Sequence, residues 1–477
     1  MDLQQKNRTK IVATIGPSSR DSETLRSLFR AGVNVTRLNF SHGTHSEHGE
    51  LIARIRSIAT DLGLHVAILQ DLPGPKVRTG GFAPGVSSVI LETGRHFSLA
   101  TEAGVGDETR VSVSYAGLAD DVTIGNRLYL ADGAIALRIV GKTSTRIDTH
   151  IEVGGELRAT QGINYPDGTL HIESVTSRDL EHLAFGLEQG VDWVAVSFVK
   201  SPEDVSRVKR VIAEKGASAL VIAKIEKHEA LACIDQIIET ADGIMVARGD
   251  LGIEIPLEQV PLVQKDLILR ANRASKPVIT ATQMLESMTN SPRPTRAETT
   301  DVANAILDGT DAVMLSGETA RGAFPVDAVR MMATIAHYVE GSYPHDAMLA
   351  RRISPDGRSI ETTIAESAAR ATAELGLRFI VSGTMSGSTA RHIASFRPLA
   401  RVLAMTPRIE VARQLALIWG VESMIVDVYH GFEEMLTIVE SRLVQEDLVH
   451  SKESVVITSG MPVGTGGTNV MKIHIIP

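Results

Sequence analysis

The sequence of 477 residues is poor in cysteine and in aromatic residues. A single cysteine, Cys233, excludes a disulfide within the chain. This favours a reducing compartment, and we expect a cytoplasmic protein. Residues 1–10 are too polar for a secretory signal, and no apolar run is long enough to cross a bilayer, so we expect no membrane partner. Aromatic residues make up only 4% of the chain, so aliphatic side chains must form its core.

The chain also has fewer basic residues than acidic ones. The chain has 48 Lys and Arg residues against 57 Asp and Glu residues, a formal net charge of −9. Nucleic-acid binding needs a basic face, so this balance argues against nucleic acid as a partner. It leaves room for a local basic pocket that binds a small phosphorylated substrate. The length exceeds what one hydrophobic core supports and predicts two to four domains.

Short apolar runs alternate with helical patterns through much of the chain, which is typical of βα units. Eight such units predict a closed (β/α)₈ barrel, an α/β fold of the TIM-barrel type. An open, doubly wound sheet remains the alternative on strand count alone. The expected strands are 11–15, 34–40, 65–70, 193–198, 220–225, 243–247, 277–281 and 312–315. The expected helices are 22–32, 46–63, 202–214, 229–240, 257–275, 295–308 and 325–340.

Two segments depart from this rhythm. Residues 73–173 are rich in β patterns (109–115, 126–130, 134–140 and 146–153) separated by turns, and no helix-length pattern intervenes. They predict a small β-barrel domain inserted into the barrel. From residue 344 the pattern predicts a separate C-terminal α/β domain with a largely parallel sheet, to which we assign regulation. Its expected helices include 409–419 and 432–445. The expected domains are therefore the barrel (1–72 and 174–343), the insert (73–173) and the C-terminal domain (344–477).

Polar residues stand where the expected barrel strands end, the side on which barrel active sites lie. Lys224 and Glu226 are two residues apart, so on one strand they point the same way. Glu226 and Asp250 could together hold a hard divalent cation such as Mg²⁺. Arg37 and Lys224 could neutralise a transferring phosphoryl group, and Gly249 lets backbone amides approach an anion. A lone basic residue is usually a surface charge, and a carboxylate pair is usually a cap or an ion pair. The coincidence at one end of the strands favours phosphoryl transfer.

With these residues aligned, the sequence resembles the pyruvate kinase family over essentially its whole length. The motifs that carry the resemblance are Thr14–Ser19, Arg37–Gly43, Ile222–Glu226, Met245–Gly252, Ala281–Met288, Pro292–Glu298 and Ser316–Thr319. The resemblance implies an enzyme of glycolysis. It would transfer the phosphoryl group of phosphoenolpyruvate to ADP, giving ATP and pyruvate, with Mg²⁺ or Mn²⁺ as cofactor. The alternatives are another phosphoenolpyruvate-handling barrel enzyme and an inactive, metabolite-binding relative.

The resemblance also assigns roles to single residues. Glu226 and Asp250 would bind Mg²⁺, while Lys224 and Arg37 would contact the phosphoryl group. The backbone amides of Gly249 and Asp250, with Thr282, would hold the substrate carboxylate. Thr282 and Ser316 would belong to the relay that protonates the enolate. Asn39, His42 and Arg78 would lie near the nucleotide phosphates, with the insert closing over them as a lid.

One stretch departs from the best-known members of the family. They have Asp-Thr-Lys-Gly-Pro-Glu after the third strand, whereas this chain has Asp-Leu-Pro-Gly-Pro-Lys from Asp71 to Lys76. A lysine there is similar to the branch that works without potassium. The ammonium of Lys76 could replace a K⁺ ion, so K⁺ would not be required. Alternatively, Lys76 points to solvent and K⁺ still binds through Asn39, Ser41, Asp71 and the carbonyl of Leu72.

A loop in the C-terminal domain resembles the effector site of the family. Hydroxyls and a glycine at a helix start can bind an anion, although an ordinary capped turn has the same composition. Gly460–Gly467 lacks the aromatic and basic residues of the animal enzymes that respond to fructose bisphosphate, which leaves AMP or a sugar monophosphate. The family also implies a homotetramer, in which Arg296 would help to order the neighbouring subunit's site. The effector residues would be Thr384, Ser386, Gly387, Ser388 and Thr389.

Overall fold

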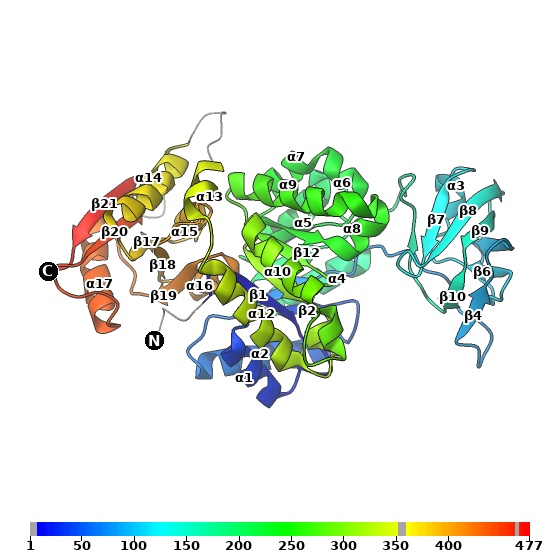
Figure 1. Cartoon of the computed structure of the whole chain (residues 1–477), viewed down its shortest axis with the longest axis horizontal. Coiled ribbons are helices and arrows are strands. Elements are labelled where there is room, and N and C mark those ends of the chain that lie inside the picture. The colour runs from blue at the N-terminus through cyan, green and yellow to red at the C-terminus, as the bar shows by residue number, and fades with distance from the viewer. Residues whose placement is uncertain (1–6, 352–358, 463–466) are drawn as a thin grey trace.

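The elements of the chain form three bodies that lie in a row (Figure 1). The computed structural model describes residues 7–351, 359–462 and 467–477. A barrel occupies the centre, the C-terminal α/β unit lies on its left and a β-rich insert lies on its right. Among the described residues, no helix is both long and apolar enough to cross a membrane.

Eight parallel strands close into the predicted barrel, which excludes the open doubly wound sheet. The strands are short, and all but the second, which carries Arg37 and Asn39, are mostly apolar and buried on both faces, as expected where helices cover the outside of a parallel sheet. Side chains such as Val12, Ile222 and Met245 fill the interior. The strands are β1 (Lys10–Thr14), β2 (Val35–Asn39), β3 (Ala67–Asp71), β12 (Trp193–Val196), β13 (Leu220–Ile225), β14 (Gly243–Ala247), β15 (Val278–Ala281) and β16 (Ala312–Leu315).

The helices around the barrel begin and end where sequence chemistry favours it. Thr295 and Glu298 form a capping box at the start of α10, and Gly309 ends that helix with φ 102°. The expected helix 229–240 is two helices that meet at Cys233. The helices are α1 (Ser22–Ala31), α2 (His45–Asp61), α4 (Ser177–Glu188), α5 (Pro202–Glu214), α6 (His228–Ala232), α7 (Ile234–Thr240), α8 (Arg248–Glu254), α9 (Val260–Arg273), α10 (Arg296–Asp308), α11 (Gly317–Ala320), α12 (Pro325–Glu340) and α13 (His345–Arg351).

Helix α4 is an element that the strand-and-helix pattern did not predict. It completes the third βα unit, but the whole insert separates it from β3. The capping box of Thr176 and Asp179 at its start is the signal that was available. Asp179 also accepts a hydrogen bond from the backbone N–H of Gly74 (3.1 Å), so the start of α4 holds the outgoing linker of the insert.

The insert has its own apolar core between β3 and α4. Its strands pair as a six-stranded sheet, ordered β11-β7-β8-β9-β5-β6, and a two-stranded sheet, β10-β4. Sequence patterns missed β4, β5 and β10, and the helix α3 (Leu118–Asp121) has only four residues. The strands are β4 (Ser88–Leu91), β5 (His96–Ala100), β6 (Arg110–Ser112), β7 (Arg127–Leu130), β8 (Ile135–Lys142), β9 (Arg146–Val153), β10 (Gly155–Arg158) and β11 (Ile163–Asn164).

The C-terminal unit contains a five-stranded sheet, ordered β19-β18-β17-β20-β21, in which only the last pair is antiparallel. This agrees with the largely parallel sheet predicted. The unit packs under the amino-terminal ends of the barrel strands, where Trp193 Nε1 of β12 donates to the carbonyl of Gln414 (3.2 Å). Its elements are α14 (Ile360–Leu375), β17 (Phe379–Gly383), α15 (Ser388–Ala394), β18 (Arg401–Thr406), α16 (Ile409–Gln414), β19 (Val421–Ile425), α17 (Phe432–Gln445), β20 (Ser454–Ser459) and β21 (Val470–Ile475).

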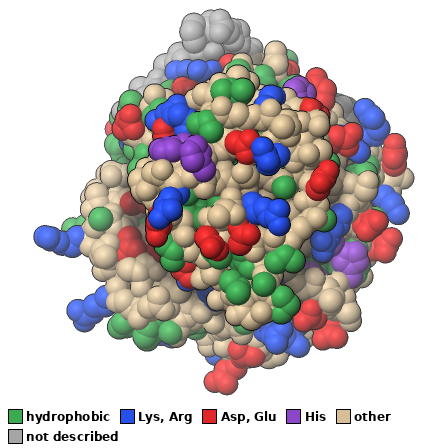
Figure 2. Space-filling view, turned by 90° about the vertical axis from the view of Figure 1, so that its right-hand side faces the viewer, with side chains coloured by type: hydrophobic (Ala, Val, Ile, Leu, Met, Phe, Trp, Pro, Cys, Tyr) green, Lys and Arg blue, Asp and Glu red, His purple; other side chains and the backbone are tan. Residues whose placement is uncertain are grey.

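Charged side chains of both signs are mixed on the exposed end of the insert. Figure 2 looks along the row from that end, and Lys and Arg side chains are interspersed there with Asp and Glu. This face therefore offers no broad basic surface of the kind that binds nucleic acid.

Candidate active site

Four charged side chains alternate in sign at the carboxyl ends of β2, β3 and β13. Asp71 is 1% exposed and accepts from Arg37 Nε (2.6 Å) and from Lys224 Nζ (3.3 Å). The Lys224 ammonium also contacts Glu226 Oε1 at 2.9 Å. Burial opposes the charge on Asp71, but Lys224 and Arg37 outweigh it and hold the pKa of this carboxyl below its usual range. Asp71 therefore carries its negative charge before any substrate arrives.

Lys224 is the buried cation at the centre of this group. Its Nζ donates to Ser197 Oγ (2.7 Å) as well as contacting Asp71 and Glu226. Burial lowers the pKa of the ammonium, but the two carboxylates raise it more, so the net shift is upward. Lys224 can therefore serve as a fixed positive charge for a substrate anion, and it is poorly suited to act as a base.

Glu226 and Asp250 are close enough to repel each other. Glu226 is 1% exposed, and its Oε2 accepts from the backbone N–H of Phe198 (2.8 Å). Burial raises the pKa of the Glu226 carboxyl, Lys224 lowers it and the charge of Asp250 raises it again, leaving it above its ordinary value. Two carboxylates that repel each other in this way form a donor set that suits a hard divalent cation. The residues present therefore fit the metal ion implied by the family.

Lys76 bridges the insert and the barrel. Its Nζ lies 3.3 Å from Asp132 Oδ1 in the insert and 3.6 Å from Asp250 Oδ1 in α8. The side chain is 27% exposed, so it does not simply point into solvent. The predicted potassium ligands have partners of their own: Asn39 Oδ1 accepts from Ser41 N, and the carbonyl of Leu72 accepts from Ser197 Oγ. Lys76 thus supplies its charge next to Asp250.

Thr282 follows β15 in a strained conformation. Its φ is 69°, and that of Gln283 is 53°, both in the left-handed region that side chains with a Cβ rarely adopt. Such residues cost about 1–3 kcal/mol each and persist only where their surroundings hold them. The Thr282 hydroxyl oxygen accepts from the backbone N–H of Gly249 (2.8 Å). In this state the Gly249 amide is used by Thr282, and the Thr282 O–H remains able to donate to a ligand.

The chain was compared with protein families and with known proteins. The model of the pyruvate kinase barrel domain matches residues 6–329, and that of the pyruvate kinase alpha/beta domain matches residues 362–474. Together these models match most of the sequence.

The chain belongs to the pyruvate kinase family.

Proteins named pyruvate kinase have high sequence identity to this chain. Pyruvate kinase 2 of Synechocystis is 46% identical over 98% of this chain and 79% of its own, and pyruvate kinase of Geobacillus stearothermophilus is 45% identical over 99% and 81%. The solved structure of a pyruvate kinase from Cryptosporidium parvum has a TM-score of 0.94 at 36% identity, covering 100% of this chain and 97% of that one. The predicted family, fold and function are thereby confirmed.

The residues expected near the nucleotide of a pyruvate kinase lie on two bodies. Asn39 and His42 are at the end of β2, and the carbonyl of His42 contacts His48 Nε2 (2.8 Å). Arg78 lies in the insert, where its Nη1 donates to the carbonyl of Thr160 (3.0 Å). The two groups can therefore face one nucleotide only in a position of the insert that brings Arg78 over the barrel.

The expected effector loop is largely satisfied by its own contacts. Gly387 N donates to Thr384 Oγ1 (2.9 Å) and Ser388 N to Ser386 Oγ (3.4 Å), while Thr389 Oγ1 contacts Thr468 Oγ1 (2.7 Å). Helix α15, which follows, has only seven residues. The N-cap of that helix is Gly387, which makes no side-chain cap, so the hydroxyls of Thr384 and Ser386 bind backbone N–H groups of the turn itself. Residues 463–466 of the expected loop Gly460–Gly467 lie outside the described residues.

Two residues at the carboxyl ends of the barrel strands were given no role by the sequence prediction, although Glu318 lies in one of its motifs. Ser197 directly follows β12 and contacts Lys224, and it was the polar residue within the apolar run 193–198. Glu318 is fully buried and accepts from Leu285 N (3.0 Å) and Ser316 N (2.7 Å), which ties the ends of β15 and β16 together. Burial raises the pKa of the Glu318 carboxyl. A glutamate three residues after a strand was the available signal.

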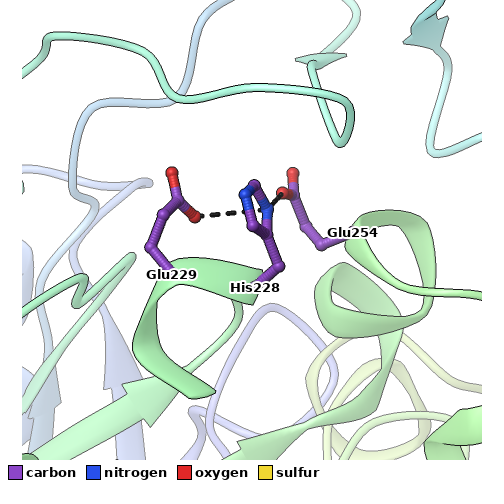
Figure 3. A group of neighbouring side chains, drawn as sticks. All are labelled: His228, Glu229 and Glu254. Atoms are coloured by element: carbon purple, nitrogen blue, oxygen red, sulfur yellow. Dashed lines mark hydrogen bonds and ion pairs between the residues drawn. The ribbon is translucent and has the colours of Figure 1, made fainter. Parts of the chain in front are cut away.

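One further group of acidic and imidazole side chains lies beside the mouth (Figure 3). His228 Nδ1 stands between Glu229 Oε2 (3.3 Å) and Glu254 Oε2 (3.2 Å). Lys227 Nζ lies 2.8 Å from Glu254 Oε2, so an ammonium already balances this carboxylate. Asn164 Nδ2 of the insert donates to the other oxygen of Glu254 (3.1 Å). We therefore interpret the group as a contact between insert and barrel.

Proposed function

We propose that the charged group around Lys224 transfers the phosphoryl group of phosphoenolpyruvate to ADP, with Mg²⁺ or Mn²⁺ held by Glu226 and Asp250. The observation that carries this proposal is a buried ammonium, Lys224, between two carboxylates at the carboxyl ends of the barrel strands. The bound cation would neutralise negative charge on the substrate oxygens. Arg37 binds the phosphate of the substrate, and its guanidinium is oriented by Asp71 and by Thr14 Oγ1 (2.9 Å).

Lys224 acts at the bond that breaks. As the phosphorus–oxygen bond lengthens, negative charge grows on the transferring group and on the enolate oxygen, and the fixed ammonium stabilises both. Because Lys224 is already held by three partners, little reorganisation accompanies the step. ADP accepts the phosphoryl group, and the enolate of pyruvate is left in the site.

Thr282 and Ser316 would complete the reaction by relaying a proton to the methylene carbon of the enolate. The Thr282 hydroxyl oxygen accepts from Gly249 N, which leaves its proton available to the site. The backbone amides of Gly249 and Asp250 would hold the substrate carboxylate, and the N–H of Gly249 would be shared between Thr282 and the ligand. Asn39, His42 and Arg78 would contact the nucleotide, and the insert would exclude water as a lid.

The remaining features of the proposal follow the family. We propose that the chain divides at 73–173 and 344–477, works in the cytoplasm and forms a homotetramer in which Arg296 helps to order the neighbouring site. A phosphorylated effector, AMP or a sugar monophosphate, would bind at Thr384–Thr389.

Potassium independence rests on Lys76. Its ammonium beside Asp250 supplies a fixed positive charge close to the proposed metal site, where a mobile cation would otherwise be needed. Lys76 would supply this charge beside Asp250. The ion itself is expected at a different place, formed by Asn39, Ser41, Asp71 and the Leu72 carbonyl.

The test is the formation of pyruvate and ATP from phosphoenolpyruvate and ADP with Mg²⁺ in potassium-free buffer, followed by addition of KCl. We expect full activity before KCl is added, and loss of activity when EDTA removes the divalent cation. Activity that appears only with KCl would retain the kinase and reject the role of Lys76. No activity under any of these conditions, with AMP and sugar phosphates present, would favour the inactive relative.

A further inference from the structure

Arg248 is a charged residue at the mouth to which the proposed reaction gives no role. It is the first residue of α8, directly before Gly249 and Asp250. Its side chain turns away from the proposed metal site toward β15, and only 12% of it is exposed. A guanidinium so deeply covered needs partners for its donors, and its partners show what it holds.

The guanidinium binds the strained segment that carries Thr282. Nη2 donates to the carbonyl of Thr282 (2.7 Å) and contacts Met284 Sδ (2.8 Å), while Nε donates to the carbonyl of Ala281 (3.3 Å). These three acceptors bracket the two residues with positive φ, Thr282 and Gln283. Arg248 therefore contacts the backbone at the place where the chain is least able to hold its own conformation.

A second element anchors the guanidinium from behind. Nη1 contacts Asp301 Oδ1 of α10 at 2.7 Å and donates to Gln264 Oε1 of α9 (3.4 Å). The planar fork of an arginine can serve both sides at once, and the single ammonium of a lysine cannot. The carbonyl of Thr282 is thus fixed to two helices of the outer ring through one side chain.

Fixing the carbonyl also fixes the hydroxyl. Thr282 Oγ1 accepts from the N–H of Gly249, the residue next to Arg248. The side chain of Arg248 and the backbone N–H of Gly249 therefore hold Thr282 at two points, its carbonyl and its hydroxyl. With both acceptor contacts set, the Thr282 O–H has a restricted direction in which to donate.

We propose that Arg248, anchored by Asp301, is a positioning residue that holds strained Thr282 so that its hydroxyl serves the proton relay. This inference rests on the proposed function, in which Thr282 belongs to that relay. Arg248 touches neither substrate nor metal in this account and acts through Thr282 alone. Its loss should therefore slow turnover much more than it weakens binding of phosphoenolpyruvate.

The test is a double-mutant cycle of Arg248→Lys and Thr282→Ala. Two rates are measured for each protein: kcat for pyruvate formation, and exchange of the pyruvate methyl protons with D₂O in the presence of Mg²⁺ and ATP, followed by NMR. We expect Arg248→Lys to lower both rates about tenfold or more, with KM for phosphoenolpyruvate changed less than about threefold. In the Thr282→Ala background, the same change should alter both rates by less than about threefold.

Two further variants guard against a general structural effect. Asp301→Asn removes the anchoring charge but keeps the size and shape of the side chain. It should lower both kcat and the proton-exchange rate, by a smaller factor than Arg248→Lys does. If Arg248→Lys does not fold, Asp301→Asn replaces it in the cycle. Arg270→Lys on α9, whose arginine pairs with exposed Asp235 and Asp266, is the matched control and should leave both rates unchanged.

The outcomes separate the inference from the function on which it rests. If the effects of Arg248→Lys and Thr282→Ala multiply, Arg248 does not act through Thr282 and the inference is wrong. If KM rises as much as kcat falls, Arg248 serves substrate binding and not the proton relay, which also overturns the inference. A wild-type chain that forms no pyruvate would reject the proposed function itself.

Discussion

At the scale of single residues, charge alternation decides what the mouth of the barrel can do. Arg37, Asp71, Lys224 and Glu226 follow one another in opposite signs, and each is held by its neighbours. Asp71 and Lys224 stabilise each other's charged forms in this way, so a fixed ammonium is in place when an anionic substrate binds.

Part of this arrangement could be predicted from strand geometry. Lys224 and Glu226 share a face because they are two residues apart, and their contact at 2.9 Å follows from that spacing. The contact of Lys76 with Asp132 and Asp250 could not be predicted in the same way, because it depends on how the insert is placed against the barrel. The spacing of residues along one strand does not indicate how the insert is placed against the barrel.

A prediction at this scale concerns the charge at Lys76. Lys76→Glu places a carboxylate beside Asp250 and removes the fixed cation, so we expect low activity without potassium and at least partial recovery with KCl. The measurement is the initial rate against KCl concentration, with NaCl at equal ionic strength as the control. If the variant shows no more potassium dependence than the wild type, Lys76 does not substitute for the ion.

At the scale of elements, the insert is joined to the barrel by few side-chain contacts. Lys200 Nζ holds the returning linker by donating to the carbonyls of Leu170 (3.1 Å) and Ile172 (2.6 Å). Asn164 of β11 donates to Glu254 of α8, whose carboxylate is fully buried and is also bound by Lys227. A body attached in this way can move as a unit about its linkers.

We predict that the bond between Asn164 and Glu254 helps to set the closed position of the insert. Asn164→Ala removes a hydrogen bond to a charged group, worth about 1.5–3 kcal/mol, so closure becomes about tenfold or more less favourable. Because Glu254 keeps Lys227, the barrel itself should be unaffected. Steady-state kinetics should show a raised KM for ADP.

The matched control for this prediction is Ser98→Ala, which removes a hydrogen bond to Asp148 (3.0 Å) within the sheet of the insert. It should leave KM for ADP unchanged. Equal effects of the two substitutions would mean that the internal stability of the insert, and not its contact with the barrel, limits nucleotide binding.

The bounds of some elements were predicted correctly from the sequence, whereas other elements were missed. Helix α17 has the bounds expected from its pattern, whereas the helix expected over 409–419 ends at Gln414 and continues as the 3₁₀ turn Leu415–Leu417. Strands β4 and β10 were missed because they are short and half-exposed, bury only Leu91 and Leu157 in the core, and pair only with each other. Local pattern identifies an element that buries one clear face, and it fails where pairing partners decide.

At the scale of the whole molecule, one buried ion pair joins the C-terminal unit to the barrel. Arg397 contacts Asp311 with both terminal nitrogens (3.1 and 2.9 Å), and the two side chains are 2% and 4% exposed. The same guanidinium stacks over Trp419 at 5.1 Å. The three-body organisation followed from the rhythm of the sequence, but this pair spans 86 positions and no local pattern indicates it.

We predict that breaking this pair destabilises the molecule much more than breaking a surface pair. Arg397→Met leaves Asp311 buried without its cation, a change that typically costs about 3–5 kcal/mol. Arg330→Met, which removes an i, i+3 partner of Asp327 on α12 where both side chains are more than half exposed, should cost less than about 1 kcal/mol. Calorimetry of both variants measures the difference, and equal shifts in Tm would contradict the role of the pair.

The central claim is that the buried ammonium of Lys224 carries phosphoryl transfer, and Lys224→Met tests it most directly. The variant removes the charge and keeps much of the side-chain volume. The measurement is kcat for pyruvate formation with saturating Mg²⁺, phosphoenolpyruvate and ADP, on protein shown by its Tm to be folded. The account predicts a loss of about 10²–10³-fold or more. A folded variant that keeps its rate within about tenfold of the wild type would contradict it.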